Sequence, residues 1–158
     1  MSKDGFNLDL YEHDFNLDNH GNPIGSYEVK RLKSHEMIEE SMLLANTLAA
    51  KQIEKLQTDN KHFGIYRNHE NISIKNENFI KELMKLAGNS LVPSQSHMKA
   101  KEINKFLNQI SFSKKKALSQ IIVRKMQKAN YSTKSIGHYG LGLKSYTHFT
   151  SPIRRYSD

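Results

Sequence analysis

Residues 34–50 have the sequence SHEMIEESMLLANTLAA, in which apolar side chains recur at steps of three and four residues. Residues spaced in this way share one face of an α-helix. The face would contain Ile38, Met42, Ala45 and Ala49, widened by Leu44, Leu48, Ile53 and Leu56. The Ser34 hydroxyl can cap the first N–H groups, and the acidic residues after it oppose the positive end of the helix dipole. The pattern predicts a long amphipathic helix over about 35–57.

On either side of this helix the sequence favours strands. Residues 6–31 contain short alternating runs around Asp18-Asn-His-Gly-Asn-Pro23. Asn, Gly and Pro favour a turn between extended segments, so we expect a β-hairpin there. After the helix, HFGIYRNH at residues 62–69 is short and aromatic and predicts a strand.

Three more amphipathic helices are expected further along the chain. The first covers about 76–87 and ends at Gly88-Asn89, because Gly accepts the conformation that closes a helix. The second is indicated by Ile103, Phe106, Leu107 and Ile110. The third is expected to start from a Ser113 cap, with Leu118, Ile121, Ile122, Met126 and Ala129 on its buried side. The elements predict an α+β fold.

Composition excludes several classes of site. The 158 residues contain no Cys, which excludes disulfide scaffolds, Cys-ligated metal sites and thiol catalysis. No run approaches the ~18 apolar residues of a membrane span, and the first residues lack the apolar stretch of a signal peptide. We therefore expect a soluble cytoplasmic protein with no membrane partner. Its apolar content of 37% is low for a chain of this length, which indicates a piece of something larger.

The charge is distributed unevenly along the chain. The net charge is +8, but residues 1–46 carry a net −5 and residues 47–158 a net +13. A field of that sign attracts polyanions such as nucleic acid. The alternative is a solvated, Lys-rich helix face without a ligand.

The last 22 residues, GHYGLGLKSYTHFTSPIRRYSD at 137–158, show no helical period. Gly140 and Gly142 permit close backbone approach or unusual torsions. The aromatic residues Tyr139, Tyr146 and Phe149 offer faces on which bases can stack, and Thr147, Thr150 and Ser151 offer hydroxyls. Arg154 and Arg155 are adjacent, so both cannot face one core, and a guanidinium pairs well with phosphate. This combination indicates nucleic-acid contact, against the alternative of packed aromatics and arginines in salt bridges.

Several blocks of this sequence resemble one family. YTHFTSPIRRYSD at 146–158 resembles, almost residue for residue, a signature of the RNB catalytic domain in the ribonuclease II and ribonuclease R family. SHEMIEESMLLANTLAA at 34–50 and YRNHE at 66–70 are similar to further family blocks in the same order, as are the segments 21–36 and 124–143. The resemblance is strongest to the bacterial ribonuclease R branch. It implies that residues 1–158 are a partial RNB domain, roughly its C-terminal half.

The resemblance implies processive 3′→5′ exoribonuclease activity on single-stranded RNA, which releases nucleoside 5′-monophosphates. By this resemblance the catalytic residue is Arg154, which would stabilise charge on the phosphate in the transition state. Arg155 would contact the incoming backbone, and Thr150 and Ser151 would reach phosphate oxygens. Either Glu39 or Glu40, with Glu40 slightly favoured, would accept a hydrogen bond from a ribose 2′-OH. The remaining RNA-binding candidates are Tyr66, Arg67 and His69, which would line a channel near the 3′ end, together with Tyr146 and His148.

The sequence also departs from the family pattern. The resemblance implies Mg²⁺ held by an Asp cluster, but Asp9, Asp14 and Asp18 do not reproduce that cluster, so the metal ligands are expected outside this chain. The aromatic residue that clamps a base would fall near Phe6 or Leu8, and a straight alignment selects Leu8. The cold-shock-type and S1-type domains of the relatives have no counterpart here.

Three functional hypotheses therefore stay open. In the first hypothesis, the chain is part of an exonuclease, and its partners are RNA and the missing portions of the same enzyme. The isolated fragment would then be inactive. Alternatively, the chain is a non-catalytic RNA-binding module, or a truncated product without function.

Overall fold

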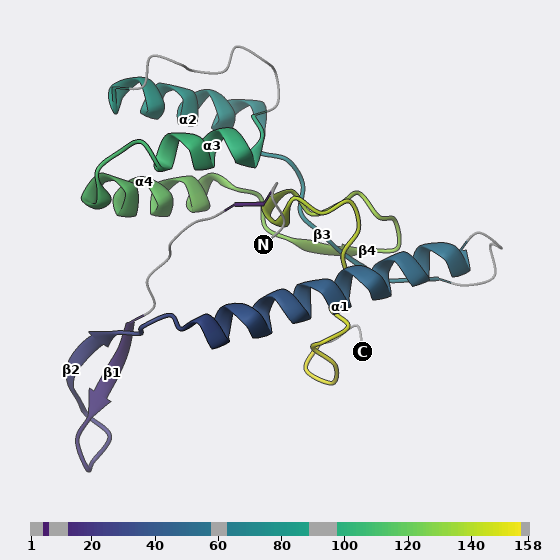
Figure 1. The fold of residues 1–158 in the computed structure, drawn as a ribbon, viewed down its shortest axis with the longest axis horizontal. Coiled ribbons are helices and arrows are strands. Elements are labelled where there is room, and N and C mark those ends of the chain that lie inside the picture. Colours follow the sequence, from purple (N-terminus) through teal and green to yellow (C-terminus); the bar gives the residue numbers. More distant parts are fainter. Residues whose placement is uncertain (1–4, 7–12, 58–62, 89–97, 156–158) are drawn as a thin grey trace.

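The computed structural model describes residues 5–6, 13–57, 63–88 and 98–155. Four helices, four short strands and one 3₁₀ turn form two small sheets and a helical layer, which confirms the α+β prediction for these residues. Figure 1 shows three short helices stacked on one side, a long helix on the other, and a hairpin extending from the start of the long helix.

The N-terminal hairpin is confirmed. Strands β1 (His13–Leu17) and β2 (Pro23–Glu28) pair antiparallel, with His13 opposite Glu28. The turn forms because the Asp18 carboxylate accepts the backbone N–H groups of His20 and Asn22, each at 2.8 Å. Every residue of both strands is exposed, so the hairpin is an arm held by local bonds.

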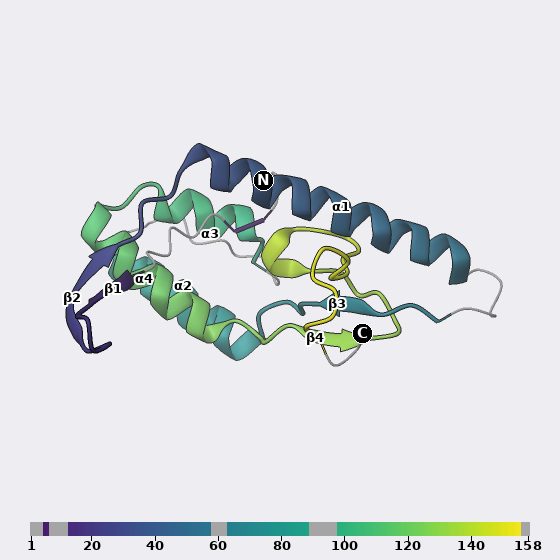
Figure 2. The ribbon, with the colours of Figure 1, turned by 90° about the horizontal axis from the view of Figure 1, so that it is seen from below.

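The long helix α1 (Lys33–Gln57) is also confirmed, but its predicted apolar face is covered only in part. Ile38 is 55% exposed and Met42 40% exposed, whereas the buried residues of α1 are Asn46 and Ala50. The physical reason is that the described chain meets α1 on the side of Asn46 and Ala50, where the C-terminal segment lies beside the helix (Figure 2). The periodic spacing shows which apolar residues share a face of the helix. It does not show which of them pack against a neighbouring segment.

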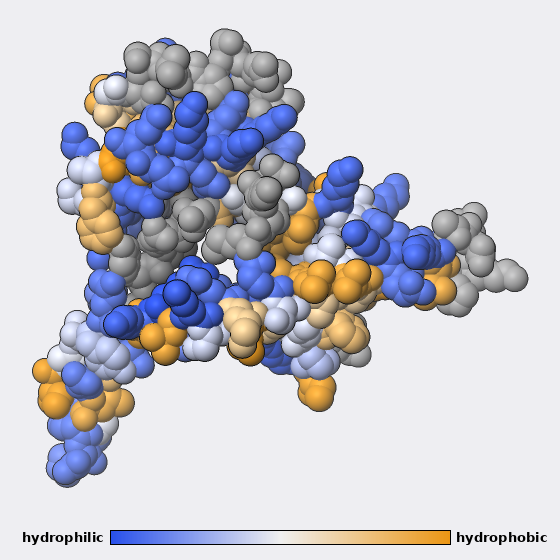
Figure 3. All heavy atoms as spheres, viewed as in Figure 1, coloured by the Kyte–Doolittle hydropathy of each residue, from blue (hydrophilic) through white to orange (hydrophobic). Residues whose placement is uncertain are grey.

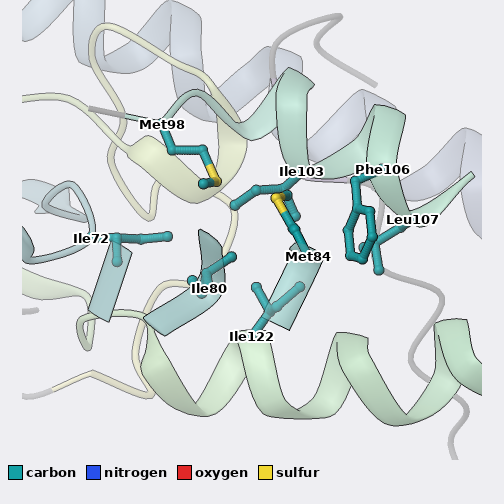
Figure 4. Close-up of a cluster of buried hydrophobic side chains, with 8 residues drawn as sticks. All are labelled: Ile72, Ile80, Met84, Met98, Ile103, Phe106, Leu107 and Ile122. Atoms are coloured by element: carbon teal, nitrogen blue, oxygen red, sulfur yellow. The ribbon is translucent and has the colours of Figure 1, made fainter. Parts of the chain in front are cut away.

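The hydrophobic core lies among three shorter helices, α2 (Ile74–Leu86), α3 (Ala100–Leu107) and α4 (Phe112–Lys125). Figure 4 shows the side chains of this cluster pointing toward one another between the helices. Its buried members are Ile72, Ile80, Met84, Met98, Ile103, Phe106, Leu107 and Ile122. Helix α1 contributes none of them, so the core of the described chain is small.

The helix ends agree with the predictions in part. The backbone N–H of Gly88 closes α2 onto the carbonyl of Lys85 at 3.0 Å, as expected, and Asn89 lies outside the described residues. The predicted Ser113 cap is wrong, because Ser111 precedes the first residue of α4 and Ser113 lies inside the helix. Helix α3 ends before Ile110, and α4 ends before Ala129.

A second sheet joins the predicted strand to segments far along the chain. Strand β3 (Tyr66–Asn68) pairs antiparallel with β4 (Asn130–Ser132), a strand that the polar sequence NYS did not reveal. The C-terminal segment runs beside β3, because the Arg67 N–H donates to the carbonyl of Tyr146 at 2.8 Å. The 3₁₀ turn η1 (Tyr139–Leu141) follows in the same segment. Figure 2 shows this segment between α1 and β3.

Candidate functional site

A cavity of about 340 Å³ lies where α1, η1 and the C-terminal segment meet. Its described walls bring together five of the predicted site residues, which are Glu39, Tyr146, Thr150, Ser151 and Arg154. The remaining lining residues are Gly5, Phe6, Met42, Leu43, Asn46, Gly140 and Leu141. Residues more than a hundred positions apart in the sequence thus line the same cavity.

Among the lining residues that the structure describes, one is a cation and one an anion, and they lie on different elements. The Arg154 guanidinium donates to the Ser151 hydroxyl at 2.8 Å, and its side chain is exposed. The Glu39 carboxylate projects from the first half of α1 and forms an ion pair with Arg31. A ligand with a phosphate and a hydroxyl suits such an arrangement, since guanidinium pairs with phosphate and carboxylate accepts from O–H groups.

Apolar side chains form another part of the wall. Phe6 packs edge-on against Tyr139, with ring centroids 5.2 Å apart and planes at 74°. The Phe6 N–H donates to the carbonyl of Gly140 at 2.9 Å, which fixes Phe6 next to η1. Of the two positions considered for an aromatic clamp, Phe6 lines the cavity and Leu8 lies outside the described residues.

Asn46 is a site residue that the sequence analysis missed. Its Nδ2 donates to the Tyr146 hydroxyl at 3.0 Å, and its Oδ1 accepts from the Thr150 backbone N–H at 2.8 Å. The signal available in the sequence was an amide in the middle of a largely apolar helical stretch, where Asn has no advantage of helix propensity.

Gly140 and Gly142 behave as the sequence predicted. The Gly140 N–H donates to Nδ1 of His69 at 2.8 Å, and a Cβ on Gly140 would lie 2.8 Å from the same atom. On its other side, His69 donates from Nε2 to the carbonyl of Gln127 at 2.7 Å. Gly142 has φ of 63°, in the left-handed region that glycine adopts at little cost.

His138 lies beside this glycine turn. Its Nδ1 accepts from the Leu141 N–H at 3.2 Å, and its ring centroid is 5.0 Å from that of His69. Burial lowers the pKa of His138 to about 4, and the neighbouring His69 and Arg67 act in the same direction. The imidazole is therefore neutral at pH 7 and serves as a hydrogen-bond acceptor.

The structure does not bring the remaining predicted residues to this cavity. Tyr66 is fully buried and donates to Oε1 of Gln57 at 2.6 Å, and burial raises the pKa of its phenol. The Arg67 guanidinium lies 4.6 Å from the centre of the Tyr131 ring, and the His148 ring packs on the same tyrosine.

Glu40 and Arg155 are half-buried and are not among the described lining residues. The slight preference for Glu40 over Glu39 therefore finds no support in the cavity. His69 lines a second hollow of about 930 Å³ on the other side of the glycine turn, where Lys99, Lys101 and Lys144 also lie.

In the part of the chain that the structure describes, no three His, Cys, Asp or Glu side chains gather as a metal site would require. No described helix is long and apolar enough to cross a membrane.

Comparison with known proteins gives consistent matches over the whole chain. Residues 1–158 match the model of the RNB domain. Ribonuclease R of Helicobacter pylori (strain ATCC 700392 / 26695) is 35% identical over 165 residues, which cover 99% of this chain and 24% of that protein. Ribonuclease R of Mycoplasmopsis pulmonis is 37% identical over 160 residues, which cover 96% of this chain and 21% of that protein.

The similarity extends to solved structures. Mycoplasma genitalium RNase R in complex with double-stranded RNA matches with a TM-score of 0.80 and 29% identity, covering 98% of this chain and 27% of that one. The complex of the same enzyme with ribose methylated single-stranded RNA gives a TM-score of 0.79. The chain spans about a quarter of the length of these relatives. On the sequence match over its full length, and on this structural similarity, the chain belongs to the RNB domain family.

Proposed function

We propose that this chain forms part of the RNA site of a processive 3′→5′ exoribonuclease that degrades single-stranded RNA to nucleoside 5′-monophosphates. The observation that carries the proposal is the cavity that Glu39 and Arg154 share with the hydroxyls of Thr150 and Ser151. Mycoplasma genitalium RNase R, the structural neighbour, has been solved in complex with RNA, which supports RNA as the class of ligand.

Each group in the cavity has a role in binding one nucleotide. Arg154, whose guanidinium is already oriented by Ser151, would bind a phosphate and oppose its growing negative charge during cleavage. Glu39 would accept a hydrogen bond from a ribose 2′-OH, a group that DNA lacks. Phe6 and Tyr146 would provide apolar surface for the base.

The family resemblance implies a magnesium-dependent reaction, and the described residues do not fit the ion. No described cluster offers three carboxylate or imidazole ligands. The ligands would come from the missing portions of the same enzyme, so no step of this proposal passes through the metal. We expect the isolated chain to bind RNA without turnover and to act in the cytoplasm as part of a longer protein.

The first test measures RNA affinity of the 158-residue chain by fluorescence anisotropy with a labelled single-stranded oligoribonucleotide. We expect Arg154→Ala to weaken binding about tenfold, because one charge-assisted contact to phosphate is lost. Arg124→Ala is the matched control, since Arg124 is exposed on α4 away from the cavity, and we expect less than a threefold effect. Equal losses for both variants would show that binding depends on net charge and not on the cavity.

The second test asks whether the chain contributes to catalysis. The preceding portion of a ribonuclease R relative is added in trans with Mg²⁺, and release of nucleoside monophosphates from a 3′-labelled strand is measured. Activity with the wild-type chain and its loss with Arg154→Ala are expected. If the added portion gives no 3′→5′ activity at any protein concentration, the exonuclease proposal is wrong.

The net charge of +13 on residues 47–158 favours a second candidate, a non-catalytic RNA-binding module. The salt dependence of RNA affinity tests this candidate, because affinity that comes from many Lys–phosphate contacts falls steeply between low and high salt. Discrimination between RNA and DNA that depends on Glu39 would instead favour the exonuclease site. Absence of a cooperative melting transition would support the third possibility, a truncated product without function.

A further inference from the structure

Asn46 has an unusual place for a polar side chain in a helix. It is 3% exposed and, with Ala50, is one of the two residues of α1 that the structure buries. A buried amide needs hydrogen-bond partners, because removing it from water without them costs free energy.

Those partners are two residues of the C-terminal segment. The Asn46 Oδ1 accepts both from the Thr150 N–H at 2.8 Å and from the Thr150 hydroxyl at 3.2 Å. The Asn46 Nδ2 donates to the Tyr146 hydroxyl at 3.0 Å. One amide therefore binds at both ends of the stretch 146–150, just before the loop that carries Arg154.

Helix geometry connects this anchor with Glu39. Seven residues separate Glu39 from Asn46, which is about two turns or ~10 Å along the axis, and both therefore lie on nearly the same face. Both line the cavity with Arg154. The distance between carboxylate and guanidinium thus depends on where the segment is fastened to α1.

We propose that Asn46 is a positioning residue, which holds the segment 146–154 on α1 so that Arg154 faces the same nucleotide as Glu39. The inference rests on the proposed function. Asn46 acts through Thr150 and Tyr146 and does not itself bind the phosphate.

The chain offers a matched control for this residue. Asn68 is 2% exposed and also makes two hydrogen bonds, donating to the carbonyl of Lys134 at 2.8 Å and accepting from the Ile136 N–H at 3.2 Å. It lies on β3 and does not line the cavity. Asn68→Ala therefore removes an equally buried amide without touching the proposed anchor.

The first measurement needs no RNA. Hydrogen exchange of the 158-residue chain, followed by NMR, should show a protected Thr150 amide, although Thr150 lies outside every helix and strand. We expect Asn46→Ala to accelerate exchange at Thr150 at least tenfold, with Ile80 and Ile122 in the core unchanged, and Asn68→Ala to leave Thr150 protected. Unchanged protection of Thr150 in Asn46→Ala would overturn the inference.

The second measurement is a double-mutant cycle on oligoribonucleotide affinity. We expect the RNA affinity to fall about fivefold in Asn46→Ala and about tenfold in Arg154→Ala. The double variant should also lose about tenfold, because Asn46 acts through Arg154. A product of the two single losses, about fiftyfold, would show that Asn46 acts independently and would refute the positioning role.

A third variant covers the case in which Asn46→Ala does not fold. The pair Tyr146→Phe and Thr150→Val removes the two hydroxyl contacts and leaves the bond from the Thr150 N–H. Tyr146 and Thr150 themselves line the cavity, so the readout for this pair is hydrogen exchange and not RNA affinity. We expect the Thr150 amide to exchange faster than in the wild type, and unchanged protection counts against the inference. If the wild-type chain binds no RNA, the proposed function fails, whereas exchange at Thr150 still decides whether Asn46 holds the segment.

Discussion

Ile153, next to Arg154, is the residue at which the backbone of the site is strained. Its φ is 71°, and it is the one non-glycine residue of the described chain with a positive φ. A β-branched side chain is disfavoured there, and such strain concentrates in loops that present functional groups. The side chain is 94% exposed, so no described packing compensates for the strain.

Ile153→Gly should therefore raise the free energy of unfolding by about 0.5–1 kcal/mol, since relief of left-handed strain exceeds the entropic cost of glycine. Urea denaturation measures this change. Ile136→Gly is the control, because Ile136 is also exposed but has no positive φ, and it should lower the free energy of unfolding. Destabilisation by Ile153→Gly of the same size as in the control would contradict the prediction.

His138 makes stability depend on pH. The unfolded chain takes up a proton near pH 6.5, whereas burial holds the pKa of folded His138 at about 4. Between these values the unfolded state binds more protons, so stability falls as the pH is lowered from 6.5 toward 4. The contribution of this one residue should be a loss of about 2 kcal/mol between pH 7 and pH 4.5.

Urea denaturation at both pH values tests this prediction. In His138→Gln the free energy of unfolding should fall between pH 7 and pH 4.5 by about 2 kcal/mol less than in the wild type. His20→Gln, at the exposed hairpin turn, is the matched control. An identical pH dependence in all three proteins would show that His138 is not the group responsible.

At the scale of elements, the contact between Gly140 and His69 holds the C-terminal segment to the residue that follows β3. His69 is fixed by its bond to Gln127, so the ring has little freedom to move away from an added methyl group. The same turn carries the carbonyl that binds Phe6. Close packing at one glycine therefore connects β3, η1 and the cavity wall.

Gly140→Ala should lower the free energy of unfolding by about 2 kcal/mol, because the new Cβ would lie 2.8 Å from His69 Nδ1. Gly25→Ala in the exposed strand β2 is the matched control, since the nearest atom to its Cβ is the Asn16 side chain at 4.0 Å. We expect a change within about 0.5 kcal/mol there. Equal effects in thermal melts would mean that the contact is not tight.

At the scale of the whole molecule, α1 has more apolar surface than the described chain covers. Met37, Leu44 and Leu48 are 64%, 62% and 55% exposed and lie on the side of the helix opposite Asn46. Figure 3 shows apolar residues along α1 and on the hairpin arm. A helix that is apolar on two opposite sides is normally buried on both, so we expect the rest of the proposed exoribonuclease to cover the outer side.

Leu44→Glu combined with Leu48→Glu should leave the free energy of unfolding of the chain within about 0.5 kcal/mol of the wild type, because both side chains are exposed. The same double variant should weaken complementation by the remaining portion of the enzyme at least tenfold in the activity assay. Leu86→Glu is the control, since Leu86 is 85% exposed at the end of α2. Full complementation by the double variant would exclude this side of α1 as the contact.

The family, the long helix α1 and the turn at 18–23 are evident from the amino-acid sequence, because motif blocks, helical periodicity and turn-forming residues depend on residues close together in the chain. The folded structure was needed to establish which side of α1 is covered, which of the two glutamates lines the cavity, and that Asn46 binds Tyr146 and Thr150 a hundred residues away. It also separated Tyr66 and His69 from the cavity, since both are buried by neighbours distant in sequence. The difference has a physical reason: a local pattern fixes the conformation of a segment, whereas contacts between segments depend on packing that no local pattern specifies.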